Sequence, residues 1–267
     1  MKLKLCDAKS LDIVKTFECG QCFRWNANDK GMYTGVVGRY LAEVETVDNE
    51  VYITSDAPAE MWADYFDLAT DYAAVSANFT GEYLHECIDY GMGIRILRQD
   101  SWEALCSFII SQCNNITRIK GIVERLCEQF GDKCEANGVG YYTFPSAERL
   151  AALRPSDLAG IRSGYRAEYI IAAARAVTTG ELDLDALKTC DYREAIKTLR
   201  QIRGVGEKVA NCVVLFGLYH MEAFPIDVWM KRALKEHFPA DFDPTSLGAY
   251  AGLAQQYIFY YSRSGGK

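Results

Sequence analysis

Short segments of apolar and aromatic residues occupy the first part of the chain. Residues 32–37, 40–45 and 50–54 are rich in β-branched and aromatic side chains, and turn residues separate them. Runs of this length and composition are typical of strands. The pattern predicts an antiparallel meander, followed by a helix over 59–78, where apolar residues recur at helical spacing.

From about residue 100 the pattern is helical throughout. We expect helices over 101–113, 116–130 and 163–179, and a further pair on either side of residues 204–206. Side chains that favour helix N-caps precede four of the predicted helices, namely Asp100, Asn115, Ser146 and Asp227. The helix that begins at Asp227 is expected to be the last one.

The two halves of the chain differ in composition. We predict an α+β fold in which an N-terminal antiparallel β-sheet domain, residues 1–95, packs on a mainly α-helical domain, residues 96–267. The formal net charge is −7, yet residues 1–90 carry −9 and residues 91–267 carry +2. This distribution excludes a protein coated in basic charge. It allows a small, local phosphate footprint with a modest salt dependence.

Ten cysteines raise the question of a secreted, disulfide-bonded protein. The N-terminus has no apolar run long enough for a signal peptide, and no apolar stretch approaches a membrane span. Cys106, Cys127 and Cys212 lie among residues with helical spacing, where a free thiol packs as a small apolar group. We expect a reduced, cytoplasmic protein that is not secreted and does not contact a membrane. Cys19 and Cys22 form a lone pair without a second pair at zinc spacing, which does not favour a metal site.

A Gly-x-Gly turn lies between two predicted helices in the segment 199–212. Gly204 and Gly206 permit positive φ and leave the backbone bare. Unpaired N–H groups at the start of the second helix can then bind an anionic oxygen, such as that of a phosphodiester. A helix-turn-helix corner that uses glycine for close packing is the alternative interpretation.

Lys208 stands in the first turn of the second helix, where the helix dipole disfavours a cation. Val205, Val209 and Cys212 trace an apolar stripe beside it, so we expect its stem to be partly buried. Both effects disfavour the charged ammonium, as an amine nucleophile requires.

Asp227 follows a proline turn and precedes a helix, so a plain N-cap is one interpretation. It also follows Lys208 by 19 residues, the length of one helix and a return loop. This spacing allows the amine and the carboxylate to face one cleft. There they could open a glycosidic bond, with the carboxylate stabilising positive charge that develops on the sugar.

Four further segments complete a pattern with the hairpin, Lys208 and the Pro225-x-Asp227 turn. They are Gly20-Gln21-Cys22-Phe23-Arg24-Trp25, Asn114-Asn115-Ile116-Thr117-Arg118-Ile119, Gly164-Tyr165-Arg166-Ala167, and Ala254-Gln255 with Phe259. In this order the set resembles the helix-hairpin-helix (HhH), Gly-Pro-Asp (GPD) superfamily of DNA glycosylases, and within it the 8-oxoguanine DNA glycosylase/AP lyase family. The resemblance extends over nearly the whole chain.

The resemblance implies an enzyme that excises 8-oxoguanine from damaged duplex DNA, with cytosine as the expected opposite base. Lys208 would attack C1′ of the damaged nucleoside and form a Schiff base, which permits strand cleavage by β-elimination. Asp227 would stabilise the oxocarbenium-like transition state. The target base must leave the helix stack before the amine can reach the sugar.

Further site residues follow from the same resemblance. In the base pocket, the Gly20 carbonyl would accept from the N7–H of 8-oxoguanine, Gln255 would contact the pairing edge, and Phe259 and Cys212 would sandwich the ring. On the DNA side, the resemblance implies that Tyr165 wedges into the gap left by the flipped base and that Arg118 and Arg166 contact the orphaned cytosine. It also implies that Asn114 contacts DNA and that Gly204 and Gly206 bind a phosphate. Solvated or core roles are the alternatives for Arg118 and Phe259.

The resemblance implies no required cofactor, and we expect a monomer. A structural cation at the hairpin is expected on the main-chain carbonyls of Arg200, Ile202 and Val205, with no metal ligand from side chains. No cysteines follow Cys212, so the iron–sulfur cluster of some relatives is not expected.

Two positions depart from the family pattern. Cys113 replaces an asparagine that contacts the orphaned cytosine, and Trp229 replaces a histidine of some members. The retained Arg118 still favours cytosine. A non-catalytic hairpin module that only binds DNA is the alternative function, but it would need neither a half-buried amine nor a carboxylate facing DNA. An alkylbase glycosylase of the same fold would generally lack the lysine.

Overall fold

The computed structural model describes residues 1–265, so the last two residues of the predicted helical domain, 266–267, lie outside the described residues. A five-stranded antiparallel sheet has the strand order β1-β5-β4-β3-β2. Its elements are β1 (Lys2–Asp7), α1 (Ile13–Glu18), β2 (Trp25–Ala27), β3 (Tyr33–Val37), β4 (Tyr40–Val47) and β5 (Glu50–Ser55). The predicted meander is confirmed as β3, β4 and β5, while β1 and β2 extend it on both sides.

An aromatic core fixes the sheet against α1 and the first helix that follows the sheet. Phe17 stacks on Trp25 with ring centroids 4.3 Å apart, and the Trp25 indole donates to the Tyr65 hydroxyl at 2.8 Å. Both Trp25 and Trp62 are almost fully buried. The segment that precedes β2, which includes Gly20, is therefore held on a rigid support.

The helix predicted over 59–78 is wrong as a single element. It is divided into α2 (Ala59–Tyr65) and α3 (Tyr72–Ser76). Asp67 takes a left-handed backbone conformation (φ 49°), which ends the first helix, and Asp71 caps the second by accepting from the Ala74 amide. Apolar residues keep a helical spacing across the break, so the sequence pattern does not reveal it.

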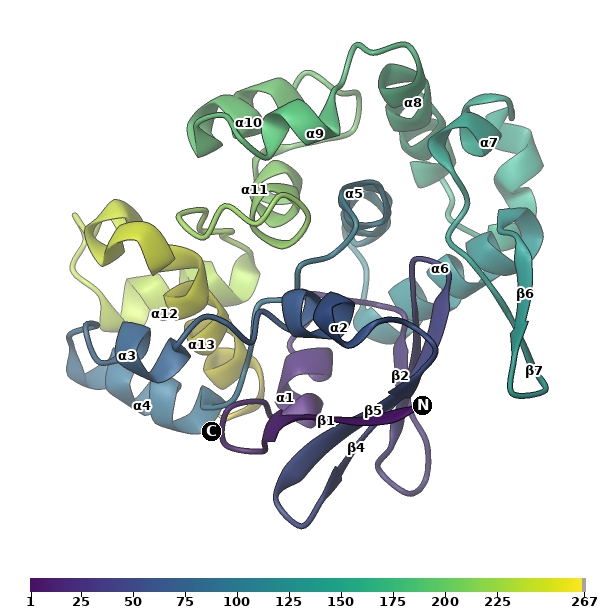
Figure 1. Cartoon of the computed structure of the whole chain (residues 1–267). Coiled ribbons are helices and arrows are strands. Elements are labelled where there is room, and N and C mark those ends of the chain that lie inside the picture. Colours follow the sequence, from purple (N-terminus) through teal and green to yellow (C-terminus); the bar gives the residue numbers. More distant parts are fainter. Residues whose placement is uncertain (266–267) are drawn as a thin grey trace.

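The remaining elements are mostly helical (Figure 1). They are α4 (Glu82–Gly91), α5 (Ser101–Ile110), α6 (Ile116–Phe130), β6 (Lys133–Ala136), β7 (Val139–Tyr142), α7 (Ala147–Ala151), the 3-10 helix η1 (Pro155–Ile161), α8 (Arg166–Thr178), α9 (Leu184–Leu187), α10 (Tyr192–Leu199), α11 (Glu207–Phe216), α12 (Val228–His237), the 3-10 helix η2 (Pro244–Tyr250) and α13 (Ala251–Ser264). The sheet and helices form the predicted α+β architecture. The predicted boundary between residues 95 and 96 stays a prediction.

All four predicted N-caps are confirmed, because each side chain accepts from an amide of its helix. Four other expectations need correction. Helix α5 ends at Ile110 rather than 113, and α8 begins at Arg166 rather than 163. The β6–β7 hairpin interrupts the helical region, and α13 follows the helix that was expected to be the last. An Asn137-Gly138 pair, with both residues at positive φ, is the turn signal that marks the hairpin.

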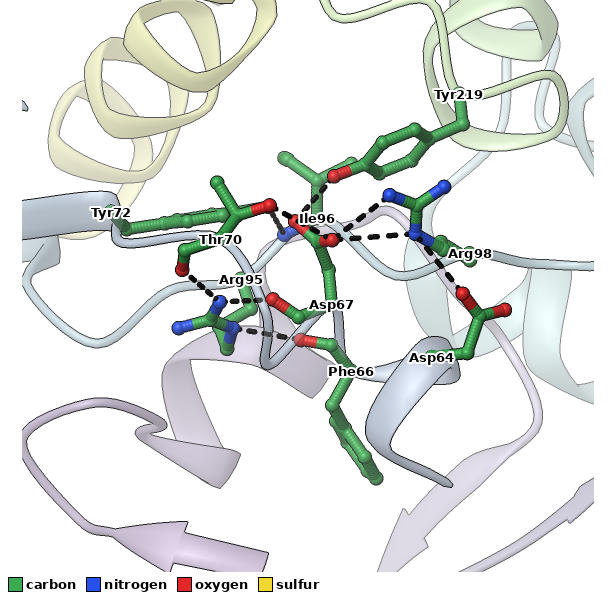
Figure 2. A network of polar contacts seen from close by, with 9 residues as sticks. All are labelled: Asp64, Phe66, Asp67, Thr70, Tyr72, Arg95, Ile96, Arg98 and Tyr219. Carbon is green, nitrogen blue, oxygen red and sulfur yellow. Dashed lines mark hydrogen bonds and ion pairs between the residues drawn. The ribbon is translucent and has the colours of Figure 1, made fainter. Parts of the chain in front are cut away.

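A polar network joins the sheet side of the molecule to the end of α11 (Figure 2). The buried carboxylate of Asp67 accepts from Arg98 at 3.0 Å and from the Tyr219 hydroxyl, while the Arg98 guanidinium lies 3.6 Å from the Tyr219 ring centroid. Nearby, Gln99 Nε2 donates to the Gln21 carbonyl at 2.8 Å. These contacts fix the segment around Gly20 relative to the helix that carries Lys208.

Candidate active site

The predicted hairpin is present between α10 and α11. Gly204 has φ +88°, and a Cβ at this position would overlap the Tyr169 ring, so both the conformation and the space require glycine. Gly206 is the N-cap of α11, and no side chain caps this helix. In residues 1–265, the amides of Glu207 and Lys208 have no acceptor, and a Cβ on Gly206 would meet open space. The start of α11 can therefore receive an anion.

Lys208 is half-buried in the first turn of α11, as expected. Its Nζ atom lies 3.4 Å from the Ser111 hydroxyl and 5.6 Å from the centroid of the Phe108 ring. No carboxylate among the described residues forms an ion pair with it, so the amine is not held by a strong partner.

Asp227 serves as the N-cap of α12 and also faces the same pocket as Lys208. Its Oδ1 atom accepts from the Met230 amide at 2.9 Å. The two interpretations of Asp227 are therefore compatible, because the cap uses one carboxylate oxygen and leaves the other for the pocket.

A small cavity of about 50 Å³ brings together both candidate catalytic residues and all four predicted base-binding residues. Its lining comes from the segment before β2, from α5, from α11, from the turn before α12 and from α13: Cys19, Gly20, Phe108, Lys208, Cys212, Phe216, Pro225, Asp227, Gln255, Gln256 and Phe259. Segments more than 200 residues apart in the chain thus meet at one point. This convergence is the main geometric feature of the site.

The Gly20 wall of the pocket is held rigidly. Gly20 has φ +81°, and a Cβ on it would stand 3.4 Å from the Phe259 ring. Gln256 Nε2 donates to the Cys19 carbonyl at 2.7 Å, and Gln21 bonds to the backbone of Arg95 and Leu97. The backbone at Gly20 is therefore fixed from both sides.

One polar atom of the pocket has no partner. Gln255 is 4% exposed, and its Oε1 atom has no hydrogen-bond partner in the described part of the chain. An unpaired buried amide oxygen is costly. A ligand with an N–H donor would satisfy it.

Cys212 forms an apolar wall rather than a reactive one. Burial raises the pKa of its thiol, and the nearby Lys208 opposes this effect only in part. The thiol is therefore neutral near pH 7 and can pack against a flat ring.

Apart from Gly204 and Gly206 of the hairpin, the predicted DNA contacts belong to the turn between α5 and α6, to the first turn of α6 and to the start of α8. Arg118 and Tyr165 are exposed, Tyr165 by 51%, and their side chains are accessible. Arg166 is buried instead, and its guanidinium donates to the carbonyls of Gln112, Cys113 and Ser163. Its position suits support of the turn better than contact with a base.

Asn114 also has partners inside the chain. Its Nδ2 donates to the Ile110 carbonyl at 3.1 Å, and its Oδ1 accepts from the Asn115 amide. Cys113 is exposed at the tip of the turn and adopts a left-handed conformation with φ 46°. The turn therefore presents Cys113 outward, and Arg118 is exposed in the first turn of α6.

The hairpin carbonyls and the cysteines bear on the metal predictions. The Ile202 carbonyl accepts from the Val205 amide at 3.0 Å, and the Arg200 and Val205 carbonyls have no such bond in the described residues. All ten cysteines are free thiols. Within residues 1–265, no three His, Cys, Asp or Glu side chains gather closely enough to hold a metal.

In the same range, no helix has the length and apolar character needed to span a bilayer.

Several pocket residues escaped the sequence reasoning. Phe108 and Phe216 stack with ring centroids 5.5 Å apart and close one side of the cavity. Their apolar spacing indicated only a helix core, and nothing local distinguishes them. Trp229 lies outside the cavity, in a groove beside Tyr83 and His237.

Comparison with known proteins gives the same result over the whole chain. Residues 4–105 match the 8-oxoguanine DNA glycosylase N-terminal domain, and residues 106–252 match the HhH-GPD superfamily of base excision DNA repair proteins. A structure of MBOgg1 with a low-affinity DNA ligand is 38% identical with a TM-score of 0.92, covering 100% of this chain and 96% of that one.

Two other relatives support the assignment. The Clostridium acetobutylicum 8-oxoguanine glycosylase/lyase, solved with DNA that contains cytosine opposite 8-oxoguanine, is 34% identical with a TM-score of 0.91. The match covers 100% of this chain and 99% of that one. The Arabidopsis thaliana N-glycosylase/DNA lyase OGG1 is 28% identical over 93% of this chain and 76% of its own length.

These matches exclude the non-catalytic hairpin module, because the relatives are N-glycosylase/DNA lyases. The predicted resemblance is confirmed. The chain belongs to the HhH-GPD superfamily of base excision DNA repair proteins and, within it, to the 8-oxoguanine DNA glycosylase/lyase family, whose members are DNA N-glycosylases and lyases.

Proposed function

We propose that this chain excises 8-oxoguanine opposite cytosine with Lys208 as the nucleophile. The convergence of the Lys208 amine, the Asp227 carboxylate and the unpaired Gln255 oxygen on one cavity carries this proposal. The nitrogen lone pair of Lys208 attacks C1′. The glycosidic bond breaks, and the electron pair of that bond leaves with the base, which takes up a proton. The nitrogen then loses a proton and forms a double bond to C1′ as the C1′–O4′ bond breaks with its electron pair on O4′, which takes up a proton, and the product is a protonated Schiff base.

Strand cleavage follows from the Schiff base. Removal of a C2′ proton sends its electron pair toward the imine, and the C3′–O bond breaks with its pair on the departing phosphate. Asp227, fixed at one oxygen by its cap, stabilises positive charge on the sugar and assists the proton transfers.

The base pocket discriminates by hydrogen bonding. The Gly20 carbonyl accepts from N7–H, which 8-oxoguanine has and guanine lacks, and Gln255 Oε1 accepts from the pairing edge. Two acceptors that face each other in a dry pocket repel, so guanine is rejected. Phe259 and Cys212 cover the two faces of the ring.

The DNA is held at two places. The amides at the start of α11, with Gly204 and Gly206, bind a phosphate, and the carbonyls of Arg200, Ile202 and Val205 bind a structural cation that supports the hairpin. Tyr165 fills the gap left by the flipped base.

The chain acts as a monomer in the cytoplasm and needs no cofactor.

Cytosine is read by Arg118, with Cys113 beside it and with Asn114 and Arg166 placed to hold the turn. A thiol offers weaker hydrogen bonding than a carboxamide. We therefore expect the preference for cytosine to depend mainly on Arg118.

The test is single-turnover release of 8-oxoguanine, and subsequent strand cleavage, from duplexes with each of the four opposite bases. We expect release from all four duplexes, fastest opposite cytosine, and cleavage without added cofactor. If 8-oxoguanine is released from none of the four duplexes, the proposal is overturned.

A further inference from the structure

Arg263 presents a buried donor without a partner beside the base pocket. It lies on α13, two turns beyond Gln255, with Phe259 between them at helical i+4 spacing. Its Nη2 atom donates to the Glu18 carbonyl. Its Nη1 atom is buried and has no hydrogen-bond partner among residues 1–265.

The free nitrogen lies next to the wall that faces the base. A Cβ placed on Gly20 would stand 3.7 Å from Arg263 Nη1, and the Arg263 guanidinium carbon lies 5.5 Å from the centroid of the Phe259 ring. Gly20 and Phe259 both line the cavity. The N–H groups of Nη1 are therefore adjacent to the place where the base presents its N7 edge.

A buried donor without an acceptor is unfavourable, and in native proteins such groups mark a ligand or an unseen partner. Gln255 lines the pocket and has an unpaired acceptor, and Arg263, about 12 Å farther along the axis of α13, holds an unpaired donor behind the wall formed by Gly20 and Phe259. A flipped 8-oxoguanine has donors on its pairing edge and a carbonyl oxygen, O8, at the opposite end. O6 also accepts, but it belongs to the pairing edge and lies nearer Gln255.

We propose that Arg263 Nη1 donates a hydrogen bond to O8 of the flipped base, which makes Arg263 a specificity-determining residue. This inference rests on the proposed function. Guanine has only a hydrogen at C8, so it leaves the guanidinium unpaired. The lesion is then recognised at two adjacent atoms, N7–H by Gly20 and O8 by Arg263.

The experiment measures the affinity of the full chain for duplexes that contain 8-oxoguanine or guanine on a 2′-fluorinated sugar, which resists excision. For Arg263→Met we expect the preference for 8-oxoguanine to fall roughly tenfold or more, with the affinity for guanine nearly unchanged. Arg149→Met removes an exposed arginine elsewhere and is expected to keep the preference. An unchanged preference in Arg263→Met, or equal losses for both bases, would overturn the inference.

Arg263→Lys guards against loss of folding, because it keeps the charge and most of the packing. An ammonium lacks the fixed fork of donors that can serve Glu18 and O8 together, so the preference should still fall. A preference equal to that of the wild type would argue against the O8 contact. The wild-type chain tests the proposed function separately: without any preference for 8-oxoguanine, the proposed function itself fails.

Discussion

The base pocket and the turn between α5 and α6 use their polar side chains in opposite ways. In the pocket, Gln255 Oε1 has no partner and Lys208 has only a long contact to a hydroxyl. In the turn, Arg166 donates to three backbone carbonyls and Asn114 is bonded at both ends. Paired groups shape the backbone, whereas unpaired groups that line a cavity are available to a substrate.

The largest expected effect is at Lys208. Lys208→Gln keeps the length of the side chain but removes the nucleophile, so borohydride should no longer trap a covalent adduct with 8-oxoguanine DNA. Lys188→Gln, at an exposed lysine paired with Asp185, is the matched control and should trap normally. Undiminished trapping by Lys208→Gln would place the nucleophile elsewhere.

Asp227→Asn separates the two roles of this residue. Asparagine caps helices as well as aspartate does, so we expect the free energy of unfolding to change by less than about 0.5 kcal/mol. Base excision should slow by about 10²-fold or more, because a neutral amide cannot balance charge on the sugar. Asp191→Asn, at the N-cap of α10, controls for the cap alone. Normal excision by Asp227→Asn would leave the cap as its one role.

Arg166 and Arg118 test the comparison directly. Arg166→Met leaves buried carbonyls without a hydrogen-bond donor, so it should lower the free energy of unfolding by about 2–3 kcal/mol in a urea titration. Arg118→Met should leave stability within about 0.5 kcal/mol but weaken the preference for cytosine by about 1–3 kcal/mol. A stable Arg166→Met that loses the preference for cytosine would reverse the assignment of the two arginines.

The pair Arg24 and Glu103 shows that an unpaired buried group does not always indicate a substrate site. Arg24 Nη1 is buried without a hydrogen bond and lies 3.6 Å from a Glu103 oxygen, beside a cavity of only about 20 Å³. That space suits a water rather than a substrate. An unpaired group is therefore informative about a substrate only where the cavity belongs to the site.

The smallest expected effect is the pH dependence at this pair. Burial raises the pKa of Glu103 from its ordinary value of 4.5 to about 7, although Arg24 opposes the shift. A raised pKa gives stability that is complete below pH 4.5 and is lost as the pH rises through 7. Relative to Glu103→Gln, the wild type should lose stability between pH 4.5 and 7, seen as a downward slope against pH in unfolding titrations. Parallel curves would show that Glu103 is ionised throughout.

Features set by neighbouring residues could be predicted from the sequence. The N-caps at Asp100, Asn115, Ser146 and Asp227 each depend on contacts three residues away, and all are present. The break at Asp67 could not be read, because its conformation is held by Arg98 and Tyr219, which are distant in the sequence.

The same distinction applies to the site. Lys208 and Asp227 could be recognised because their motifs are short and local. The burial of Arg166 and the unpaired atoms of Gln255 and Arg263 could not, since each depends on which backbone groups the fold brings near. Residue type and spacing identify a candidate site residue. The hydrogen bonds that its side chain forms with distant segments decide whether it is available to a substrate or supports the backbone.

The most direct test identifies the residue that becomes attached to DNA. The wild-type chain is trapped with borohydride on a duplex with 8-oxoguanine opposite cytosine, digested, and mapped by mass spectrometry. The pocket geometry predicts a single deoxyribose-derived adduct on Lys208, in the peptide that follows the hairpin. An adduct on another lysine or on the N-terminal amine, with Lys208 unmodified, would contradict the account.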